Sequence, residues 1–213
     1  MPNNSNKDVI KTGIFGGAFN PVHNGHVNLA REAAAQLKLR RLIIIPTFEP
    51  PHKSNKLLPF DDRSEMCRVA FSDISEKCPR CTIEVSDIER RMGGVSYTIN
   101  TLRELKREYP KEQFFLLIGG DSLFSFEKWF KYESILNECK VCALARGGDS
   151  LAEMMEFANE MGRVKVLPSD VVDVSSTEIR EKLRNSEDIS GLVPEKVAEY
   201  ISEHNFFTEE GAL

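Results

Sequence analysis

The stretch "TGIFGGAFNPVHNGHVNLAREAAAQL" (residues 12–37) decides the fold. A short apolar segment leads into Gly16 and Gly17, and the residues after the second histidine have apolar positions at helical spacing. This order predicts a strand, a glycine-rich turn and a helix. The unpaired amides and the positive dipole end at a helix start favour a phosphate group, and Gly25 leaves space beside that start. The stretch therefore predicts a phosphate-binding turn.

His23 and His26 flank Gly25 and belong to the 4 histidines of the chain. An imidazole can donate a hydrogen bond to a phosphate oxygen in either protonation state. Each histidine alone could be a polar residue at a helix cap, but the pair behind a glycine-rich turn indicates nucleotide chemistry. The turn lacks both the Gly-Lys-Ser/Thr of a Walker loop and the Gly-x-Gly-x-x-Gly of a dinucleotide-binding turn.

Short apolar runs alternate with segments of helical period along the rest of the chain. The runs are TGIFG (12–16), LIIIP (42–46), TIEVS (82–86), FFLLIG (114–119), VCALA (141–145) and VKVLP (164–168). Such alternation predicts repeated βα units around a parallel sheet. We therefore expect an α/β fold, a Rossmann-like doubly wound parallel sheet with helices on both faces. It should form a single domain over residues 8–207 with a helical C-terminal segment and frayed ends at 1–7 and 208–213.

Helix faces are expected where apolar residues recur every three or four positions. These residues are Val27, Ala30, Ala34 and Leu37 in one segment, Ile99, Leu102 and Leu105 in another, and Val193, Val197 and Ile201 around Pro194, where a last helix should begin. Residues 46–63 and 88–98 are expected to form long loops. In an open parallel sheet, such loops emerge at the carboxyl ends of the strands, where ligands bind.

The composition limits the class of partner. A net charge of −5 and a pI near 5.5 argue against nucleic-acid binding, whereas a small anionic substrate needs only a local cluster of donors. No apolar run approaches the ~20 residues of a membrane span, and residues 1–11 have no apolar signal region. We therefore expect a cytoplasmic protein that binds neither nucleic acid nor membranes.

Two close cysteine pairs, Cys78/Cys81 and Cys139/Cys142, resemble half-sites of a zinc ribbon. They lie much further apart than the ~15–20 residues that usually separate the two halves. Cys139 and Cys142 also fall on an expected strand, where residues three apart point to opposite faces. We expect buried free thiols, and the odd count of 5 cysteines argues against a disulfide framework.

Several sequence blocks resemble a known family. "GGAFNPVHNGH" (16–26) resembles the phosphate-binding signature of the nucleotidylyltransferase superfamily, whose histidine pair handles the phosphates of ATP. "PTFEPPHK" (46–53), "GGVSYTINTL" (93–102) and "IGGDSLFSFEKW" (118–129) are similar to blocks of bacterial nicotinate-mononucleotide adenylyltransferases. "DVSSTEIREKL" (173–183) and "LVPEKVAEYI" (192–201) resemble the C-terminal blocks of that family. The resemblance covers nearly the whole chain.

The resemblance implies a reaction and a set of site residues. ATP and nicotinate mononucleotide would give nicotinate adenine dinucleotide and pyrophosphate, a step of NAD biosynthesis. The implied catalytic residues are His23, His26 and Arg180. The implied ATP contacts are Gly16, Gly17, Phe19, Asn20, Gly25, Lys53, Asp121, Arg146, Ser176 and Thr177. The implied contacts to nicotinate mononucleotide are Tyr97, Thr98 and Trp129.

Some of these residues have competing structural roles. Lys53 could be a surface lysine, Asp121 a helix cap and Trp129 a core residue. Either Ser175 or Ser176 can cap the helix that begins at "SSTEIR". Asn20, where many family members have aspartate, departs from the family pattern.

The cofactor is implied by the triphosphate. Mg²⁺ commonly keeps most of its water and binds through phosphate oxygens, so ATP is expected to bring it and no protein ligand is nominated. A homo-oligomer is left open. The alternatives are another nucleotidylyltransferase, acting on nicotinamide mononucleotide or phosphopantetheine, a catalytically silent nucleotide sensor, and a zinc-dependent nucleic-acid binder.

Overall fold

The computed structural model describes residues 9–51, 57–72, 74, 78–145, 150–170 and 172–208. Within these residues one parallel sheet of six strands has the order β3-β2-β1-β4-β5-β6. The strands are β1 (Lys11–Gly17), β2 (Arg41–Pro46), β3 (Thr82–Val85), β4 (Gln113–Gly119), β5 (Lys140–Leu144) and β6 (Val164–Leu167). Every apolar run that predicted a strand forms one, which confirms the doubly wound α/β fold. The strand order reverses between β1 and β4, the usual place for a ligand crevice.

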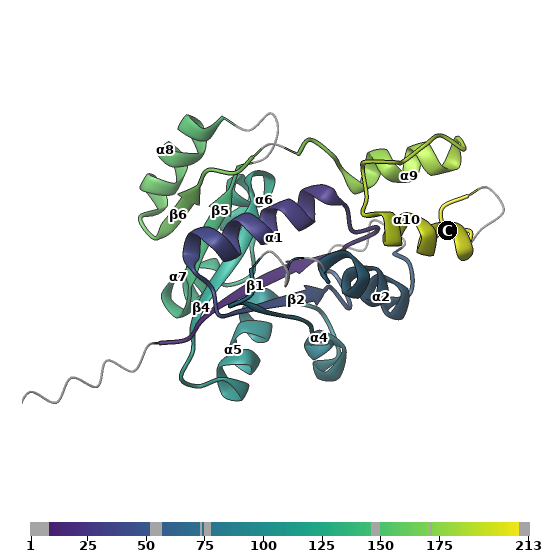
Figure 1. Cartoon of the computed structure of the whole chain (residues 1–213). Coiled ribbons are helices and arrows are strands. Elements are labelled where there is room, and N and C mark those ends of the chain that lie inside the picture. The colour runs from purple at the N-terminus through teal and green to yellow at the C-terminus, as the bar shows by residue number, and fades with distance from the viewer. Residues whose placement is uncertain are drawn as a thin grey trace, which may run out of the picture.

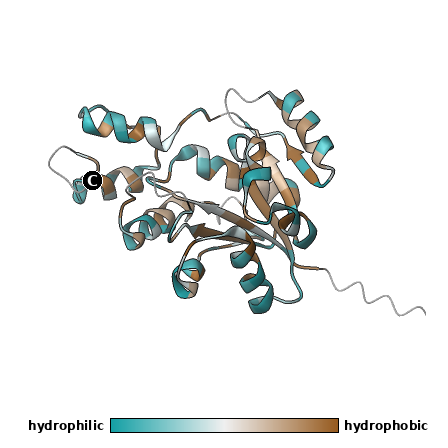
Figure 2. Cartoon of the chain, turned by 180° about the vertical axis from the view of Figure 1, so that it is seen from behind, coloured by the Kyte–Doolittle hydropathy of each residue, from teal (hydrophilic) through white to brown (hydrophobic). Residues whose placement is uncertain are grey.

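Helices cover both faces of this sheet (Figure 1). On one face lie α1 (Asn24–Leu37), α2 (Phe60–Phe71), α9 (Ser176–Arg184) and α10 (Glu195–Glu203). On the other lie α4 (Ile88–Met92), α5 (Thr98–Glu108), α6 (Gly120–Phe124), α7 (Tyr132–Glu138) and α8 (Leu151–Met161), with a short 3₁₀ turn, η1 (Phe126–Lys128). Apolar residues concentrate in the strands and on the inner sides of the helices (Figure 2). Among the described residues, no helix is both long and apolar enough to cross a bilayer.

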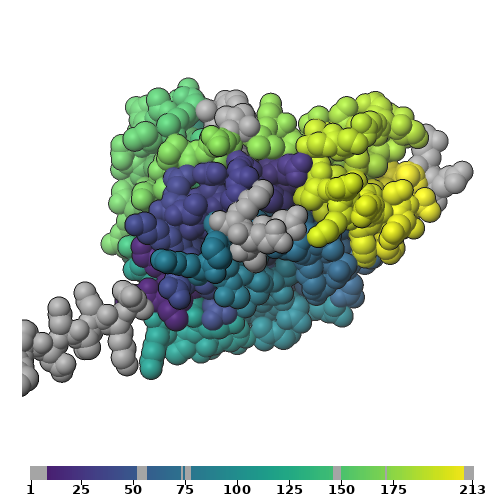
Figure 3. Space-filling view, in the orientation of Figure 1, coloured from purple at the N-terminus to yellow at the C-terminus, as the bar shows by residue number. Residues whose placement is uncertain are grey.

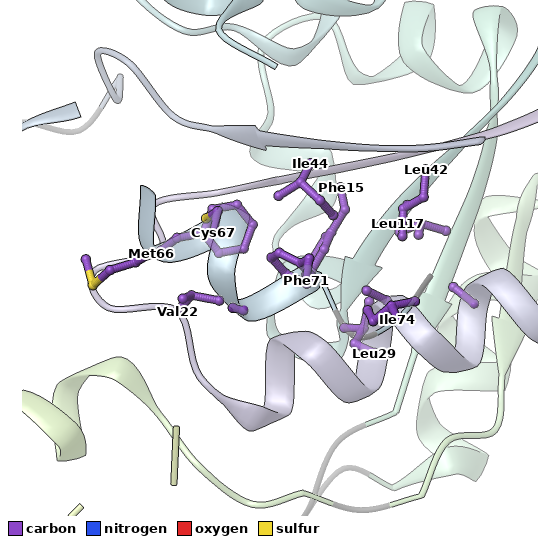
Figure 4. Packing of buried hydrophobic residues seen from close by; sticks show 14 of the residues in the cluster. Phe15, Val22, Leu29, Leu42, Ile44, Met66, Cys67, Phe71, Ile74 and Leu117 are labelled. Atoms are coloured by element: carbon purple, nitrogen blue, oxygen red, sulfur yellow. The ribbon is translucent and has the colours of Figure 1, made fainter. Parts of the chain in front are cut away.

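Alternation along the strands builds a core on each face. Phe15 packs in the cluster beneath α1 and α2, while its neighbour Ile14 packs in the cluster beneath α5. Figure 4 shows Phe15, Ile44 and Leu117 of the sheet beside Leu29 of α1 and Phe71 of α2. The sheet is therefore held between two apolar layers, and its carboxyl edge is left for the loops.

Two loop predictions are partly wrong. The segment 46–63 ends inside α2, which begins at Phe60, and 88–98 contains the short helix α4. The apolar pattern of α2 is interrupted because Arg63 and Ser64 are themselves buried. A polar pair on the inner face of a helix conceals the periodicity from which a helix is recognised.

The C-terminal part of the chain returns along α1 to the carboxyl edge of the sheet (Figures 1 and 3). Gln36 donates to the carbonyl of Pro168 at 2.7 Å, and the backbone N–H of Asn24 donates to the carbonyl of Leu192 at 2.9 Å. The expected last helix is confirmed as α10, with Val193, Val197 and Ile201 all buried. The ends predicted to fray lie almost wholly outside the described residues.

Candidate active site

The turn between β1 and α1 folds tightly onto Phe19. Phe19 is buried and has a φ of 46°, in the left-handed region that few residues with a side chain adopt. A Cβ on Gly17 would lie 3.0 Å from the Phe19 ring, so this ring fits only because Gly17 has no side chain. The backbone N–H of Thr47 donates to the carbonyl of Gly17 at 2.8 Å. The glycine turn is thus fixed to the chain that follows β2.

The two imidazoles lie against each other at the start of α1. The ring centroids of His23 and His26 are 3.6 Å apart with an interplanar angle of 31°. The backbone N–H of His23 donates to Nδ1 of His26 at 3.2 Å, which places the proton of a neutral His26 on Nε2. A Cβ on Gly25 would lie 3.1 Å from Cε1 and Nδ1 of His23. Gly25 therefore provides the space that the His23 ring occupies.

The start of α9 docks onto this turn. Ser175 is the helix cap, because its Oγ accepts from the backbone N–H of Glu178 at 3.1 Å. The Ser176 hydroxyl instead donates to the carbonyl of Pro21 at 2.9 Å. Of the two serines that could cap α9, Ser175 is therefore the cap. Ser176 instead joins α9 to residues 16–26, which we call the histidine turn.

Arg180 makes the second connection between α9 and the turn. Its Nη1 donates to the carbonyl of Asn20 at 2.7 Å, and its Nη2 donates to the hydroxyl of Thr177 at 3.1 Å. Burial and the neighbouring Arg184 lower the pKa of Arg180, although an arginine stays charged at neutral pH. A half-buried positive charge therefore lies one turn inside α9, directly against the histidine turn.

A cavity of about 700 Å³ opens beside the glycine turn. Gly16 and Gly17 line one part of it, and Tyr97, Thr98 and Trp129 line another. Tyr97 is the N-cap of α5 and its ring lies 4.5 Å from that of Phe130, measured between centroids. α5 therefore begins at this end of the cavity, and the first amides of a helix have no partner within the helix.

Comparison with known proteins identifies the family. A family model described as cytidylyltransferase-like matches residues 14–182. The chain is 37% identical to a protein of Geobacter metallireducens named "Probable nicotinate-nucleotide adenylyltransferase", over 94% of this chain and 100% of that protein. A protein of the same name from Fusobacterium nucleatum is 39% identical, over 90% of this chain and 97% of the relative. The chain belongs to the nicotinate-nucleotide adenylyltransferase family.

A solved structure agrees with this fold. The Plasmodium falciparum nicotinic acid mononucleotide adenylyltransferase, solved in complex with NaAD, superimposes with a TM-score of 0.78 at 17% identity and covers 93% of this chain and 97% of that one. The resemblance predicted from the sequence blocks is confirmed at the level of the family and the fold.

In this nicotinate-nucleotide adenylyltransferase family member, the predicted residues fall into two adjoining groups. The histidine turn and α9 bring together His23, His26, Phe19, Asn20, Gly25, Ser176, Thr177 and Arg180. The cavity brings together Gly16, Gly17, Tyr97, Thr98 and Trp129. Asp121 is an exposed residue in the first turn of α6, whose N-cap is Gly119, and it does not line the cavity. Lys53 and Arg146 lie outside the described residues.

Several polar residues of this region were not predicted from the sequence. Arg63 of α2 is buried, and Glu89 of α4 lines the cavity. The cavity lining also includes Thr47, Ser96, Thr101, Ser122, Ser125 and Lys128. The one signal for Arg63 is its position on the same helix face as Met66, Cys67 and Ala70, where a charge is unusual. Glu89 lies in a polar segment and gives no such signal.

The five cysteines lie in or against the two apolar cores. All five are free thiols, and no cluster of three His, Cys, Asp or Glu side chains in the described part of the chain could hold a metal ion. Cys142 packs in the core on the α1 face, while Cys139, which directly precedes β5, packs against the core on the other face. Burial raises the pKa of Cys139 to about 12 and that of Cys142 to about 11.

Proposed function

We propose that this protein transfers the adenylyl group of ATP to nicotinate mononucleotide, within one domain over residues 8–207. The products are nicotinate adenine dinucleotide and pyrophosphate. Family membership supports the reaction. The lining of the cavity is the observation that assigns one end of the site to the phosphates and the other to the pyridine ring of the mononucleotide. Gly16 and Gly17 line the cavity together with Tyr97 and Trp129, so a mononucleotide in the cavity would present its phosphate to the histidine turn.

The reaction requires positioning more than acid–base catalysis. With a second pKa near ~6, the 5′-phosphate of the mononucleotide is largely dianionic at neutral pH and needs no general base. One of its oxygens bonds to the α-phosphorus of ATP, while the bond from that phosphorus to the bridging oxygen breaks and pyrophosphate leaves with the electron pair. The protein must hold two anions in line and provide donors for the leaving group.

His23, His26 and Arg180 are the proposed donors. Since Nδ1 of His26 accepts from the backbone, Nε2–H is the donor that this imidazole can offer to a phosphate oxygen. Arg180 contributes a positive charge held against the turn by its bond to the carbonyl of Asn20. The amides at the starts of α1 and α9 add partial positive charge for the triphosphate.

Trp129, Tyr97 and the first amides of α5 are the proposed recognition elements for the pyridine end. Trp129 is half-buried and its ring lies 5.1 Å from that of Phe126, so the cavity has an aromatic wall against which a pyridine ring could stack. Helix amides suit a carboxylate better than an amide group, because their donors and the helix dipole favour negative charge. This arrangement supports selection of the acid form.

Mg²⁺ is proposed to enter with ATP. The described residues offer no cluster of three metal-ligating side chains, and a magnesium ion held by the triphosphate needs none. When bound, the ion neutralises phosphate charge; the protein residues supply position and hydrogen bonds.

A substrate panel tests the proposal. Purified full-length protein is given Mg²⁺, ATP and one acceptor at a time: nicotinate mononucleotide, nicotinamide mononucleotide or phosphopantetheine, and released pyrophosphate and the dinucleotide product are measured. We expect turnover with nicotinate mononucleotide to exceed that with the amide form by at least about ten-fold, because a mismatched polar contact costs a few kcal/mol. Equal rates would reject the acid selectivity, and no turnover with the acid form would reject the function.

A further inference from the structure

A buried arginine connects two loops at the carboxyl edge of the sheet, the turn after β1 and the segment between β2 and α2. Arg63 donates from Nη1 to the carbonyl of Ala18 at 2.8 Å, from Nη2 to that of Thr47 at 2.8 Å and from Nε to that of Leu58 at 2.9 Å. Its side chain is 2% exposed. The three bonds use the planar guanidinium group, which lysine lacks. Arg63 therefore fixes the histidine turn against the chain that follows β2.

The peptide group that joins Thr47 to Phe48 lies between this arginine and a carboxylate. Its carbonyl accepts from Arg63, and its N–H donates to Oε2 of Glu89 at 3.1 Å. A cation at the oxygen and an anion at the N–H polarise one peptide group in the same direction, which strengthens both hydrogen bonds.

Glu89 extends the connection to the other end of the cavity. Its second oxygen, Oε1, accepts from the hydroxyl of Thr101 at 3.0 Å, and Thr101 lies on α5, one turn after Tyr97. Glu89 also lines the cavity itself. A continuous series of hydrogen bonds therefore starts at the histidine turn and passes through Arg63 of α2 to the Thr47–Phe48 peptide. It continues through Glu89 of α4 to the start of α5.

We propose that Arg63 and Glu89 are positioning residues that fix the ATP end of the site relative to its mononucleotide end. This inference rests on the proposed function. An in-line reaction between two separately bound nucleotides depends on their relative placement, and an error of about 1 Å can lower the rate about a hundred-fold. Neither residue needs to touch the reacting phosphates for its loss to slow the reaction.

Glu89 is the better residue to change, because removing the buried Arg63 side chain takes the donor away from three backbone carbonyls at once. Glu89→Ala removes both acceptors, and we expect it to lower kcat between about ten- and a hundred-fold at saturating substrates. Glu89→Gln can still accept from the Phe48 N–H and can donate its amide hydrogen to the Thr101 hydroxyl. We therefore expect the glutamine variant to recover kcat to within about three-fold of the wild type.

The chain contains a matched control at the opposite edge of the sheet. Glu112 is also a carboxylate that accepts from a threonine hydroxyl, that of Thr12, and from a cation, Arg41. Glu112→Ala likewise removes a carboxylate with two hydrogen-bond donors, one of them a threonine hydroxyl, at a residue that does not line the cavity. It should therefore lower the melting temperature while leaving kcat within about two-fold. Equal losses of kcat in the two alanine variants, or no recovery in a Glu89→Gln protein that melts like the wild type, would overturn the inference.

ATP titration calorimetry separates this inference from the proposed function. If the wild type and Glu112→Ala proteins showed no turnover with nicotinate mononucleotide, the function would fail, but the connection between the two ends could still be measured. Glu89→Ala should weaken ATP binding by at least about three-fold, although Glu89 acts on the turn through the Thr47–Phe48 segment, which is bonded both to Gly17 and to Arg63. Unchanged ATP affinity would contradict the positioning role.

Discussion

The guanidinium of Arg180 donates a 2.7 Å hydrogen bond to the backbone carbonyl of Asn20, although the two residues are 160 positions apart in the chain. The same side chain reaches the hydroxyl of Thr177. A proposed catalytic cation is therefore also part of the framework that shapes the histidine turn. Its two roles can be separated by substitutions that keep either the charge or the bonds.

Arg180→Lys keeps the positive charge but cannot maintain both bonds at once. We expect kcat/KM for ATP to fall between about ten- and a hundred-fold, with a loss of about 1–2 kcal/mol in the free energy of unfolding. Steady-state kinetics and urea unfolding measure the two effects. Arg184→Ala, on the exposed side of α9 one turn later, is the control and should change neither by much. A lysine variant with wild-type kinetics would show that charge alone is sufficient.

His26→Gln tests whether the second imidazole is chemical or structural. Glutamine at the third position of a helix can accept from the N–H of the capping residue, so it can replace the bond that His26 accepts from His23. We expect the glutamine variant to unfold at nearly the wild-type urea concentration and yet to lose at least about a hundred-fold in kcat, as should His26→Ala. Recovery of turnover by glutamine, but not by alanine, would assign His26 a structural role only.

Gly25→Ala tests the placement of the first imidazole. The new methyl group would meet the His23 ring at 3.1 Å and the Val174 side chain at 3.2 Å, so one of them must shift. Alanine is the better helix former by up to about 1 kcal/mol, which offsets part of the strain. We expect a small change in unfolding free energy and a loss of about ten-fold or more in kcat. Wild-type kcat would show that the position of His23 matters little.

The Tyr200 hydroxyl donates to Asp62 at 2.9 Å and joins α10 to α2. Burial, and then the hydrogen bond and negative charge of Asp62, raise the pKa of this phenol from 10.0 to about 12. The folded state thus holds the proton more tightly than the unfolded state. The contribution of the Tyr200 hydroxyl to the free energy of unfolding is therefore complete below pH 10 and is lost as the pH rises toward 12.

Tyr200→Phe removes this contribution. We expect the variant to be less stable than the wild type by about 1 kcal/mol at pH 8, and the difference to shrink as the pH rises through that window. Urea unfolding at a series of pH values measures the difference. A gap that stays constant up to pH 12 would show that the hydroxyl does not link proton binding to folding in this way.

The parts of the fold that depend on local sequence could be predicted. Buried strands such as β4 are uninterrupted apolar runs, and α1 and α5 show their buried faces in the spacing of Ala30 and Ala34 or of Leu102 and Leu105. The histidine turn was recognisable because its glycines and imidazoles are consecutive in the sequence. The family resemblance located the same residues independently.

The connections between segments could not be predicted. Arg63, the Thr47–Phe48 peptide and Glu89 come from three separate elements, and only the folded chain brings them together. The choice between Ser175 and Ser176 as the cap of α9 is likewise decided by the distant carbonyl of Pro21. Sequence pattern identifies the residues that suit a phosphate, but the tertiary contacts decide how they are held.

The histidine turn depends on a part of the chain that the ribosome makes much later. The carbonyl of Pro21 accepts from the hydroxyl of Ser176, which lies 155 residues downstream, and the N–H of Asn24 donates to the carbonyl of Leu192. Neither bond can form until the later residue has been synthesised. At synthesis rates of about 5–20 residues per second, that delay is on the order of ten to thirty seconds. A nascent chain released before α9 would carry the glycines and both histidines, but it would lack the partners that hold them. Only translation through the final helices completes a competent enzyme.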